Sequence, residues 1–408
     1  MSSLPFIAAR HLKSRHDFSF ITVIGYLSIA GLAIGVCVLI LTLSILNGFE
    51  RQIQEKIISF DGHIRLKSYL GGPLPATNSL LDSVMRRIPE ILDRAPYVHH
   101  SAVLRYGLKT EGVFLEGISA KKAKSVFGTP DLLLSGEFHF QENEDGYSGI
   151  VVGSALAEKL GLSTGNRVVL FDLSTIGSLG KPPRLGQFYV AGTYKTGLRE
   201  YDETIVYMDI TSAQQLVGYD DKITGEILKL ESAQSAAPVA DKLNQLAGYP
   251  YFPSTWKDRH HDLFAWLSVQ KYPITIIFAL TALVAIINIT SSLTMIVMEK
   301  VRDIGVLRAM GYSRRGISGL FVLEGGVVGL VGALLGEVLA LVLGLLQMKY
   351  GILRIPEDVY FMKELPILFE VIHFVTVGAI AFLLALGATL YPSWKASCIL
   401  PGEAVRYE

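Results

Sequence analysis

The sequence predicts an α-helical membrane protein with four transmembrane helices plus a large α/β extracytoplasmic domain. Charged residues make up only 18% of the 408 positions, whereas soluble domains usually carry about 25%. Four apolar segments are each long enough to cross a bilayer, and residues 48–271, between the first two, have the composition of a folded soluble domain. Nucleic-acid-binding proteins usually carry an excess of basic residues, whereas the formal net charge of this chain is zero. No nucleic acid is therefore expected as a partner.

The first predicted span covers residues 18–47. No Asp, Glu, Lys or Arg occurs from Phe18 to Phe49, and a helix needs about 20 apolar residues to cross the hydrocarbon core. A cleaved signal peptide, the alternative, would have an apolar region of only about 7–15 residues. We therefore expect a membrane helix, preceded by an amphipathic cytoplasmic N-terminus at residues 1–17.

The domain at residues 48–271 alternates short β-rich runs with amphipathic helices. Two strand–helix–strand units, at about 62–109 and 224–253, bracket a β-rich middle, which predicts one subdomain inserted into another. The insert and its host are expected at about 111–219 and at about 48–110 with 220–271.

Helices are expected to connect this domain to the first two spans. Phe49, Ile53, Ile57 and Phe60 recur at helical spacing, so the first membrane helix should continue outward as a stalk, and residues 254–272 should run helically into the second span. Inside the domain, a further helix and a strand are predicted at residues 79–94 and 101–110.

One loop of the domain, residues 172–187, is unusually long and rich in Gly, Pro and cations. Loops of this length without secondary structure are usually binding elements or disordered, and a stiff Pro-Pro pair suits a protein partner. An ordinary mobile hairpin is the alternative. The candidate contact residues are Lys181, Pro182, Pro183 and Arg184.

The remaining spans are predicted at residues 272–298, 316–348 and 371–394, with a short outer loop at 349–370. Two carboxylates, Glu324 and Glu337, interrupt the third span, and carboxylates in a bilayer are functional by default. They stand about 20 Å apart along a helix, so they are not a paired acid/base site. We expect Glu324 to reach the cytoplasmic basic loop, while the role of Glu337 stays open.

Small residues recur at a spacing of four in the first and third spans. Such rows let helix backbones approach closely, within one chain or between two copies. The rows are Gly31 and Gly35 in the first span, and Gly325, Gly329 and Ala333 beside Gly332, Gly336, Ala340 and Gly344 in the third.

The loop at residues 299–315 is the most basic segment between spans, which predicts a cytoplasmic position for it, for the N-terminus and for the tail at 395–408. Ile304, Leu307 and Met310 recur in it at helical spacing and form an apolar knob, with Arg302 and Arg308 beside them. Such a helix either lies on the membrane surface or docks into a groove of a cytoplasmic protein.

Motifs of enzyme chemistry are missing. The chain has no GxxxxGK[ST] phosphate loop, no HExxH, no GxSxG and no CxxC, so we expect no catalytic residue, no bound cofactor or metal, and no ATP hydrolysis by this chain alone. His260 and His261 are adjacent and point about 100° apart on a helix, so they do not share a metal-binding face.

Several segments together resemble the LolC/LolE family of lipoprotein-releasing permeases. They are the first span with its NGFE ending, then SFDGHI, VVGSALAEKLGLSTGNRVVLF, the TGLREYD element, EKVRDIGVLRAMGYSRRGI, FVLEGG and the closing PGEAVRYE. The NGFE and TGLREYD elements are the most specific to this family, whereas the 299–315 loop and PGEAVR are shared with the wider FtsX/MacB-like permeases.

The resemblance implies a four-span ABC transporter permease in the inner membrane of a Gram-negative bacterium, with a MacB-type periplasmic core of Porter-like and Sabre-like parts. It implies a second permease subunit (the same chain or a LolE/LolC-like homologue), a separate LolD-like ATPase that binds ATP and Mg, a LolA-like periplasmic chaperone, and lipoprotein as substrate. The expected activity is ATP-driven extraction of lipoproteins by mechanotransmission, in which the stalks carry motion outward.

The implied sites map onto three groups of residues. The 172–187 loop lies where LolC-type subunits carry a chaperone-capturing hook. The ATPase-coupling residues are expected to be Arg302, Ile304, Leu307, Arg308 and Met310. The lipoprotein cavity is expected to be lined by Leu43, Leu46, Asn47, Phe49, Tyr272, Ile276 and Ile277.

Three other functions are compatible with parts of this pattern. MacB-like efflux permeases typically carry a fused ATPase domain, which this chain lacks, and FtsX-like signalling permeases that control a cell-wall hydrolase have a smaller outer domain. An intramembrane enzyme would use Glu337, and retention of activity in Glu337→Gln would exclude it.

Overall fold

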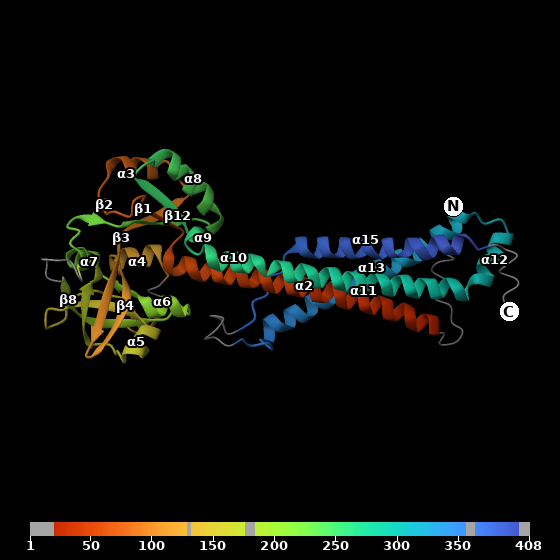
Figure 1. Cartoon of the computed structure of the whole chain (residues 1–408), viewed down its shortest axis with the longest axis horizontal. Coiled ribbons are helices and arrows are strands. Elements are labelled where there is room, and N and C mark those ends of the chain that lie inside the picture. The colour runs from red at the N-terminus through yellow and green to blue at the C-terminus, as the bar shows by residue number, and fades with distance from the viewer. Residues whose placement is uncertain (1–19, 129–131, 176–183, 356–363, 400–408) are drawn as a thin grey trace. The chain divides into compact units, whose positions relative to one another are not determined.

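The computed structural model describes residues 20–128, 132–175, 184–355 and 364–399. It divides into two compact units, which are described separately (Figure 1). Among the described residues, the helical unit contains 20–50, 266–354 and 364–399, and the sheet unit contains 51–128, 132–175, 184–265 and residue 355.

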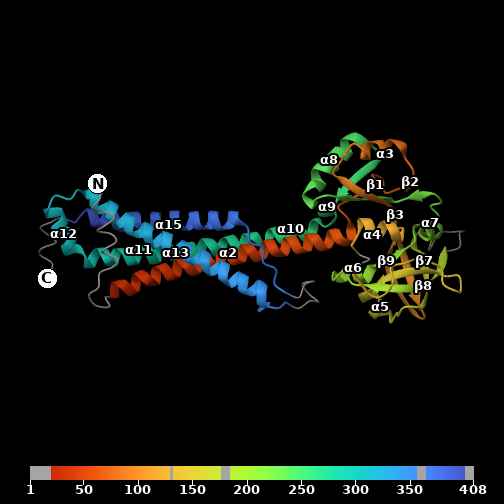
Figure 2. The same ribbon diagram turned by 180° about the vertical axis from the view of Figure 1, so that it is seen from behind.

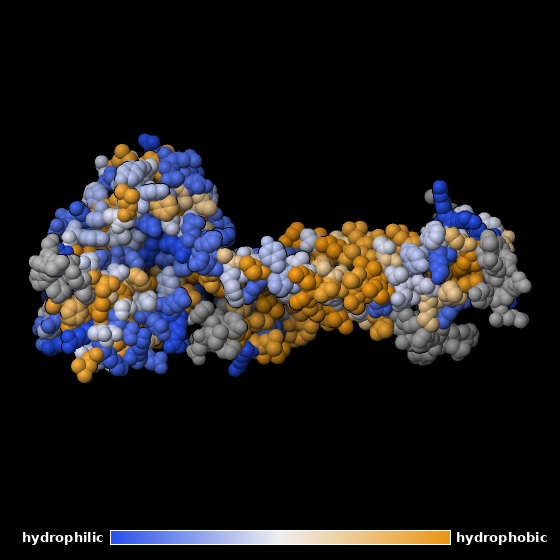
Figure 3. Space-filling model, in the orientation of Figure 1, coloured by the Kyte–Doolittle hydropathy of each residue, from blue (hydrophilic) through white to orange (hydrophobic). Residues whose placement is uncertain are grey.

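Four long helices dominate the helical unit, and each is long and apolar enough to cross a membrane. Space-filling Figure 3 shows apolar side chains concentrated on their outer surface. The predicted spans lie within these helices over their described residues. The four are α2 (Phe20–Asp61), α11 (Lys271–Glu299), α13 (Arg314–Tyr350) and α15 (Val371–Ser397), with the short α12 (Val301–Ala309) between α11 and α13.

The small-residue rows pack helices of the same chain together. A Cβ on Gly329 would lie 2.5 Å from the Cβ of Ala385, so the first row of α13 contacts α15. A Cβ on Gly336 would lie 2.6 Å from the carbonyl oxygen of Ala33, so the second row contacts α2. Gly344, in the same second row, instead faces Phe369 in the segment before α15. The small residues of α13 thus let several neighbours approach its backbone closely.

Figure 2 shows the sheet unit from behind, with β1, β3, β7, β8 and β9 among the labelled strands. The unit is built on one ten-stranded sheet, in the order β12-β1-β11-β3-β4-β9-β6-β8-β5, with β7 paired to β3 and β8. A two-stranded β10-β2 ribbon lies beside it. The strands are β1 (Ile64–Ser68), β2 (Leu74–Pro75), β3 (Ile91–Tyr106), β4 (Lys109–Gly117), β5 (Leu133–Gly136), β6 (Ser148–Gly153), β7 (Arg167–Asp172), β8 (Leu185–Tyr194), β9 (Ile205–Met208), β10 (Lys222–Ile223), β11 (Gly225–Leu230) and β12 (Tyr251–Thr255).

The helices of the sheet unit are short. Their apolar faces cover the sheet, as the buried Leu156 of α5 and Leu243 of α8 illustrate. They are α3 (Ser79–Met85), α4 (Ala120–Val126), α5 (Ser154–Leu160), α6 (Arg199–Thr204), α7 (Ile210–Val217), α8 (Ala236–Ala247) and α9 (Trp256–Arg259), followed by α10 (His261–Val269).

Strand β3 joins the two parts of the sheet. Residues 91–97 pair with β11, and residues 98–106 pair with β4, so the change of partner falls inside one strand. The sequence places the start of the inserted part near residue 111. The change of pairing partner falls earlier, near residue 98, because β3 is one long strand that pairs first with β11 and then with β4.

Two local predictions are wrong. The helix expected at 79–94 ends at Met85, and residue 91 opens β3, because Pro89 cannot continue a helix and restricts the residue before it. The strand expected at 101–110 is a hairpin. Its two-residue turn begins at Gly107, whose φ of +60° suits the first position of a type II′ turn.

The helical extensions agree with the stalk expectation for the first span. α2 continues to Asp61, and Gly62 ends it in the left-handed conformation with φ of +70°. The helical segment that leads to the second span begins at Trp256, where Thr255 and Asp258 form a capping box. It is interrupted at His260, between α9 and α10.

Candidate functional site

Helix α12 exposes a stripe that differs from the predicted knob. Ile304 is 3% exposed and belongs to the core of the helical unit, and Leu307 packs against that core. Val306 is 50% exposed and Met310 is 76% exposed. The predicted docking contacts of Ile304 and Leu307 are therefore corrected, because the chain's own helices cover this side of α12. The outward stripe consists of Arg302, Asp303, Val306, Ala309 and Met310.

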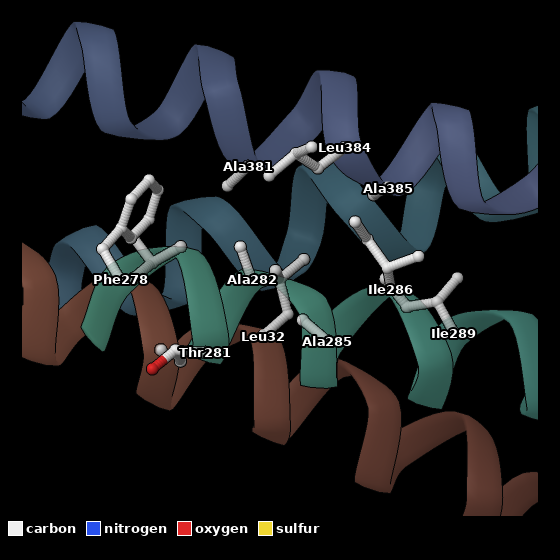
Figure 4. Close-up of a pocket in the computed structure, with 12 residues that line it drawn as sticks. Leu32, Phe278, Thr281, Ala282, Ala285, Ile286, Ile289, Ala381, Leu384 and Ala385 are labelled. Atoms are coloured by element: carbon white, nitrogen blue, oxygen red, sulfur yellow. The ribbon is translucent and has the colours of Figure 1, made fainter. Parts of the chain in front are cut away.

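Two adjoining apolar hollows lie along α2 and α11, and the first also reaches α15. Figure 4 shows side chains of the three helices around the first hollow. Gly35 faces Thr281, so no large side chain fills the space between α2 and α11 at this level. The first hollow is lined by Leu32, Gly35, Val36, Phe278, Thr281, Ala282, Ala285, Ile286, Ile289, Ala381, Leu384 and Ala385. The second is lined by Gly35, Val38, Leu39, Thr42, Ile274, Ile277, Phe278 and Thr281.

Part of the predicted cavity lies at these hollows. Ile277 lines the second one, and Tyr272 and Ile276 are exposed on the same helix. Leu43 packs against the core of the helical unit and Leu46 is buried, so their side chains are used in packing. The α2 residues that line the two hollows lie between Leu32 and Thr42, before the predicted Leu43 and Leu46.

The NGFE element, residues 47–50, has packing partners of its own. The Nδ2 atom of Asn47 lies 3.4 Å from Nδ1 of His373, and Glu50 pairs with Lys271 at 3.1 Å. A Cβ on Gly48 would lie 2.5 Å from the carbonyl oxygen of Pro366, so only glycine allows the segment before α15 to pass here. Asn47 therefore contacts α15, which corrects its predicted position in the cavity lining. Phe49 is half-buried and lines neither hollow.

The base of the 172–187 loop is anchored to the sheet. The fully buried Asp172 accepts hydrogen bonds from the backbone N–H and the hydroxyl of Ser174, and its Oδ1 lies 2.8 Å from Nε2 of His100. Arg184 donates a hydrogen bond to the carbonyl oxygen of Val217, so its guanidinium also helps to hold the base of the loop. The predicted contacts Lys181, Pro182 and Pro183 lie outside the described residues.

The two carboxylates of the third predicted span, Glu324 and Glu337, both lie in α13. Glu324 is buried in α13, and Glu337 is half-buried with its carboxylate against Gly378 of α15. Among the described residues, no group of three or more His, Cys, Asp or Glu side chains could hold a metal ion.

A buried ionic cluster at the end of α2 was not predicted from the sequence. Asp61 pairs with Arg65 of β1 at 2.8 Å and with Arg259 of α9 at 2.6 Å, and Arg65 also pairs with Glu116 of β4 at 2.7 Å. Glu116 and Asp61 raise the pKa of Arg65 well above its ordinary value despite burial, which favours the charged form. The SFDGHI element, which contains Asp61, was the available signal for this region.

Beside this cluster lies His63, whose Nδ1 has no hydrogen-bond partner among the described residues. Burial, with the nearby charges of Lys229 and Arg259, lowers the pKa of His63 to about 4. An unfolded chain would bind a proton at this histidine below pH of about 6.5. Because the unfolded state then binds more protons, this residue lowers the free energy of unfolding by up to about 3 kcal/mol as pH falls from 6.5 toward 4.

The expected result for His63→Gln is a weaker acid destabilisation than in the wild type. The measurement is urea unfolding of the detergent-solubilised chain at about pH 7 and about pH 4.5. It is followed by the fluorescence of the buried Trp256 in a Trp266→Phe/Trp394→Phe background. Equal pH dependence in the two proteins would show that His63 does not contribute.

Comparison with known proteins gives the family. The model of the MacB-like periplasmic core domain matches residues 26–246, and the model of the FtsX-like permease C-terminal region matches residues 275–401. The lipoprotein-releasing system transmembrane protein LolC of Xylella fastidiosa (strain Temecula1) is 30% identical over 419 residues, covering 98% of each chain. LolC of Neisseria meningitidis serogroup B is 32% identical over 412 residues, and LolE of Haemophilus influenzae is 26% identical over 415, each again with 98% of both chains covered. The chain therefore belongs to the LolC/LolE family of lipoprotein-releasing system transmembrane proteins.

Proposed function

We propose that this chain is the transmembrane permease subunit of an ABC transporter that extracts lipoproteins from the inner membrane and passes them to a periplasmic chaperone. The observation that carries the proposal is similarity over 98% of the chain to proteins named as LolC. The fold supports it, since four helices able to span a membrane accompany a domain that matches the MacB-like periplasmic core. Its Porter-like and Sabre-like parts would correspond to the two parts of the sheet that share β3.

The energetics explain why such a permease needs ATP. Each buried CH₂ of an acyl chain contributes about 0.8 kcal/mol to membrane anchoring, so a lipoprotein with several chains leaves the bilayer very slowly without help. This chain has no phosphate-binding loop, so a separate LolD-like ATPase would bind ATP and Mg.

The outward stripe of α12 suits the contact with that ATPase. It presents Val306 and Met310 as an apolar centre beside the charged Arg302 and Asp303, the arrangement by which a short helix docks into a groove. Force applied to α12 would enter the helical unit through Ile304, which is packed in its core.

The hollows along α2 and α11 suit acyl chains. Their lining is almost entirely apolar, and the exposed Tyr272, Ile276 and Ile277 extend the apolar surface along α11. Acyl chains would lie against α2 and α11, with a second permease subunit (a copy of this chain or a LolE/LolC-like homologue) opposite.

A photo-crosslinking side chain at Ile277 should capture lipoprotein in native membranes, because Ile277 lines a hollow and is 61% exposed. Val338 of α13 is the matched control, since it is 58% exposed and lines neither hollow. The measurement is a lipoprotein-specific blot of the cross-linked permease. Equal capture at both positions, or capture at Val338 alone, would refute the assignment of the hollows.

A further inference from the structure

The C-terminal end of α2 is held by a dense set of bonds from α9. The guanidinium of Arg259 reaches the Asp61 carboxylate at 2.6 Å, the backbone oxygens of Asp61 and Gly62 at 3.0 and 3.1 Å, and the backbone oxygen of Ser254 at 2.6 Å. Carbonyl groups at a helix C-terminus attract cations, so this arginine both neutralises Asp61 and occupies unsatisfied acceptors. α2 and α9 are therefore joined at their ends by one side chain.

The same cluster reaches both parts of the sheet. Arg65 belongs to β1, in the first part, and its partner Glu116 belongs to β4, in the second. Arg65 and Glu116 are both buried, and the other carboxylate oxygen of Glu116 lies 2.8 Å from Nδ1 of His99 on β3. The Arg65 guanidinium also lies 4.7 Å from the centre of the Tyr97 ring.

Helix α6 also contacts this cluster, through Tyr201. The ring of Tyr201, in α6, packs 4.3 Å from the ring of Phe60 on α2, and its hydroxyl lies 3.2 Å from Nε2 of His260. His260 in turn lies 3.0 Å from Asp61. Tyr201 belongs to the TGLREYD element, whose Asp202 fixes the local loop by accepting hydrogen bonds from the N–H and hydroxyl of Thr196.

Apolar contacts tolerate sliding, whereas buried ion pairs do not. Displacing α2 relative to β1 and α9 would leave Asp61 buried without Arg65 and Arg259, and displacing β1 relative to β4 would separate Arg65 from Glu116. Either change leaves a buried charge without its partner, which is strongly unfavourable. The cluster therefore resists relative movement of the helix ends and the sheet far more than an apolar interface of the same size would.

We propose that Asp61, Arg65, Glu116, Tyr201, Arg259 and His260 form a rigid joint that makes the ends of α2 and α9 move together with both parts of the sheet unit. This role rests on the proposed function: because of the joint, displacement of the helices moves the sheet unit and thereby promotes lipoprotein release. These residues are positioning residues, since they act on cargo only through the sheet unit they hold.

The first test replaces Arg259 with lysine in the full transporter, with Arg51→Lys as control. Arg51 lies in α2 and pairs with Glu55 on the exposed surface, so the same chemical change is made outside the proposed joint. Arg259→Lys should lower the lipoprotein released per ATP hydrolysed by about tenfold, with little change in ATP hydrolysis, while Arg51→Lys leaves both unchanged. Tyr201→Phe, which removes one hydroxyl, should lower the same ratio by a smaller factor. Unchanged release per ATP in both joint variants would overturn the proposal.

The second test is independent of cargo. Spin labels at Gln52 of α2 and Asn244 of α8, both exposed, are introduced into a chain carrying Cys37→Ala and Cys398→Ser. A rigid joint predicts one narrow distance distribution that ATP does not alter in the otherwise unmodified chain and in Arg51→Lys, and a broad one in Arg259→Lys. An equally narrow distribution in Arg259→Lys would refute the joint. If the unmodified transporter releases no lipoprotein, the proposed function fails, while these distances still decide on the joint.

Discussion

Replacing Val306 with glutamate should reduce ATP-dependent lipoprotein release by about 100-fold or more while the chain remains folded. Val306 lies at the centre of the outward stripe of α12, where a carboxylate would replace an apolar contact and lose its hydration in the proposed ATPase interface. The measurement is release from proteoliposomes that contain the transporter, together with the amount of ATPase that co-purifies with the permease.

Two variants of the same helix serve as controls for this prediction. Val306→Ile keeps the apolar surface and should keep release. Ile304→Glu places the charge in the helical core instead, and should lower the yield of folded permease. Normal release and normal ATPase recovery in Val306→Glu would show that the ATPase does not bind this stripe.

Replacing Arg65 with methionine should lower the free energy of unfolding by about 3–5 kcal/mol, because it removes a cation that pairs with Glu116 and Asp61 in the protein interior. The measurement is urea unfolding followed by Trp256 fluorescence. The double variant Arg65→Met/Glu116→Gln should recover most of the loss, since Asp61 keeps Arg259 as a partner. A loss below about 1 kcal/mol, the size expected of a surface ion pair, would contradict the burial of this pair.

The elements that follow from local sequence could be predicted well. Length and apolarity placed the four long helices, and alternation placed most strands, because these signals depend on neighbours in the chain. The errors arose where a single residue decides the outcome. Because of Pro89, only the first part of the helix predicted at 79–94 forms, as α3. Gly107 allows a turn, so the strand predicted at 101–110 is a hairpin.

The candidate sites were less predictable because they depend on which face of a helix its own chain covers. Helical spacing grouped Ile304, Leu307 and Met310 into one apolar knob, whereas the structure buries Ile304 in the helical core and exposes Met310. Spacing also could not show that Val306 faces outward. Similarly, Leu43 and Leu46 have the apolar character of a cavity lining, yet they pack against neighbouring helices.

The joint could not be predicted at all from spacing. Asp61, Glu116, Tyr201 and Arg259 are separated by tens of residues, and only the order of strands in the sheet brings them together. Two family-like elements, SFDGHI and TGLREYD, turn out to meet there through Phe60 and Tyr201. Short elements of this kind identify important regions, but their partners emerge only from topology.

The most direct test of the proposed function is depletion of this protein in its native cell, followed by membrane fractionation and detection of an outer-membrane lipoprotein. The account predicts that the lipoprotein accumulates in the inner membrane and that the wild-type chain, but not Val306→Glu, restores its normal distribution. Normal sorting of lipoproteins after depletion, with altered cell division or drug sensitivity instead, would contradict a role in lipoprotein release.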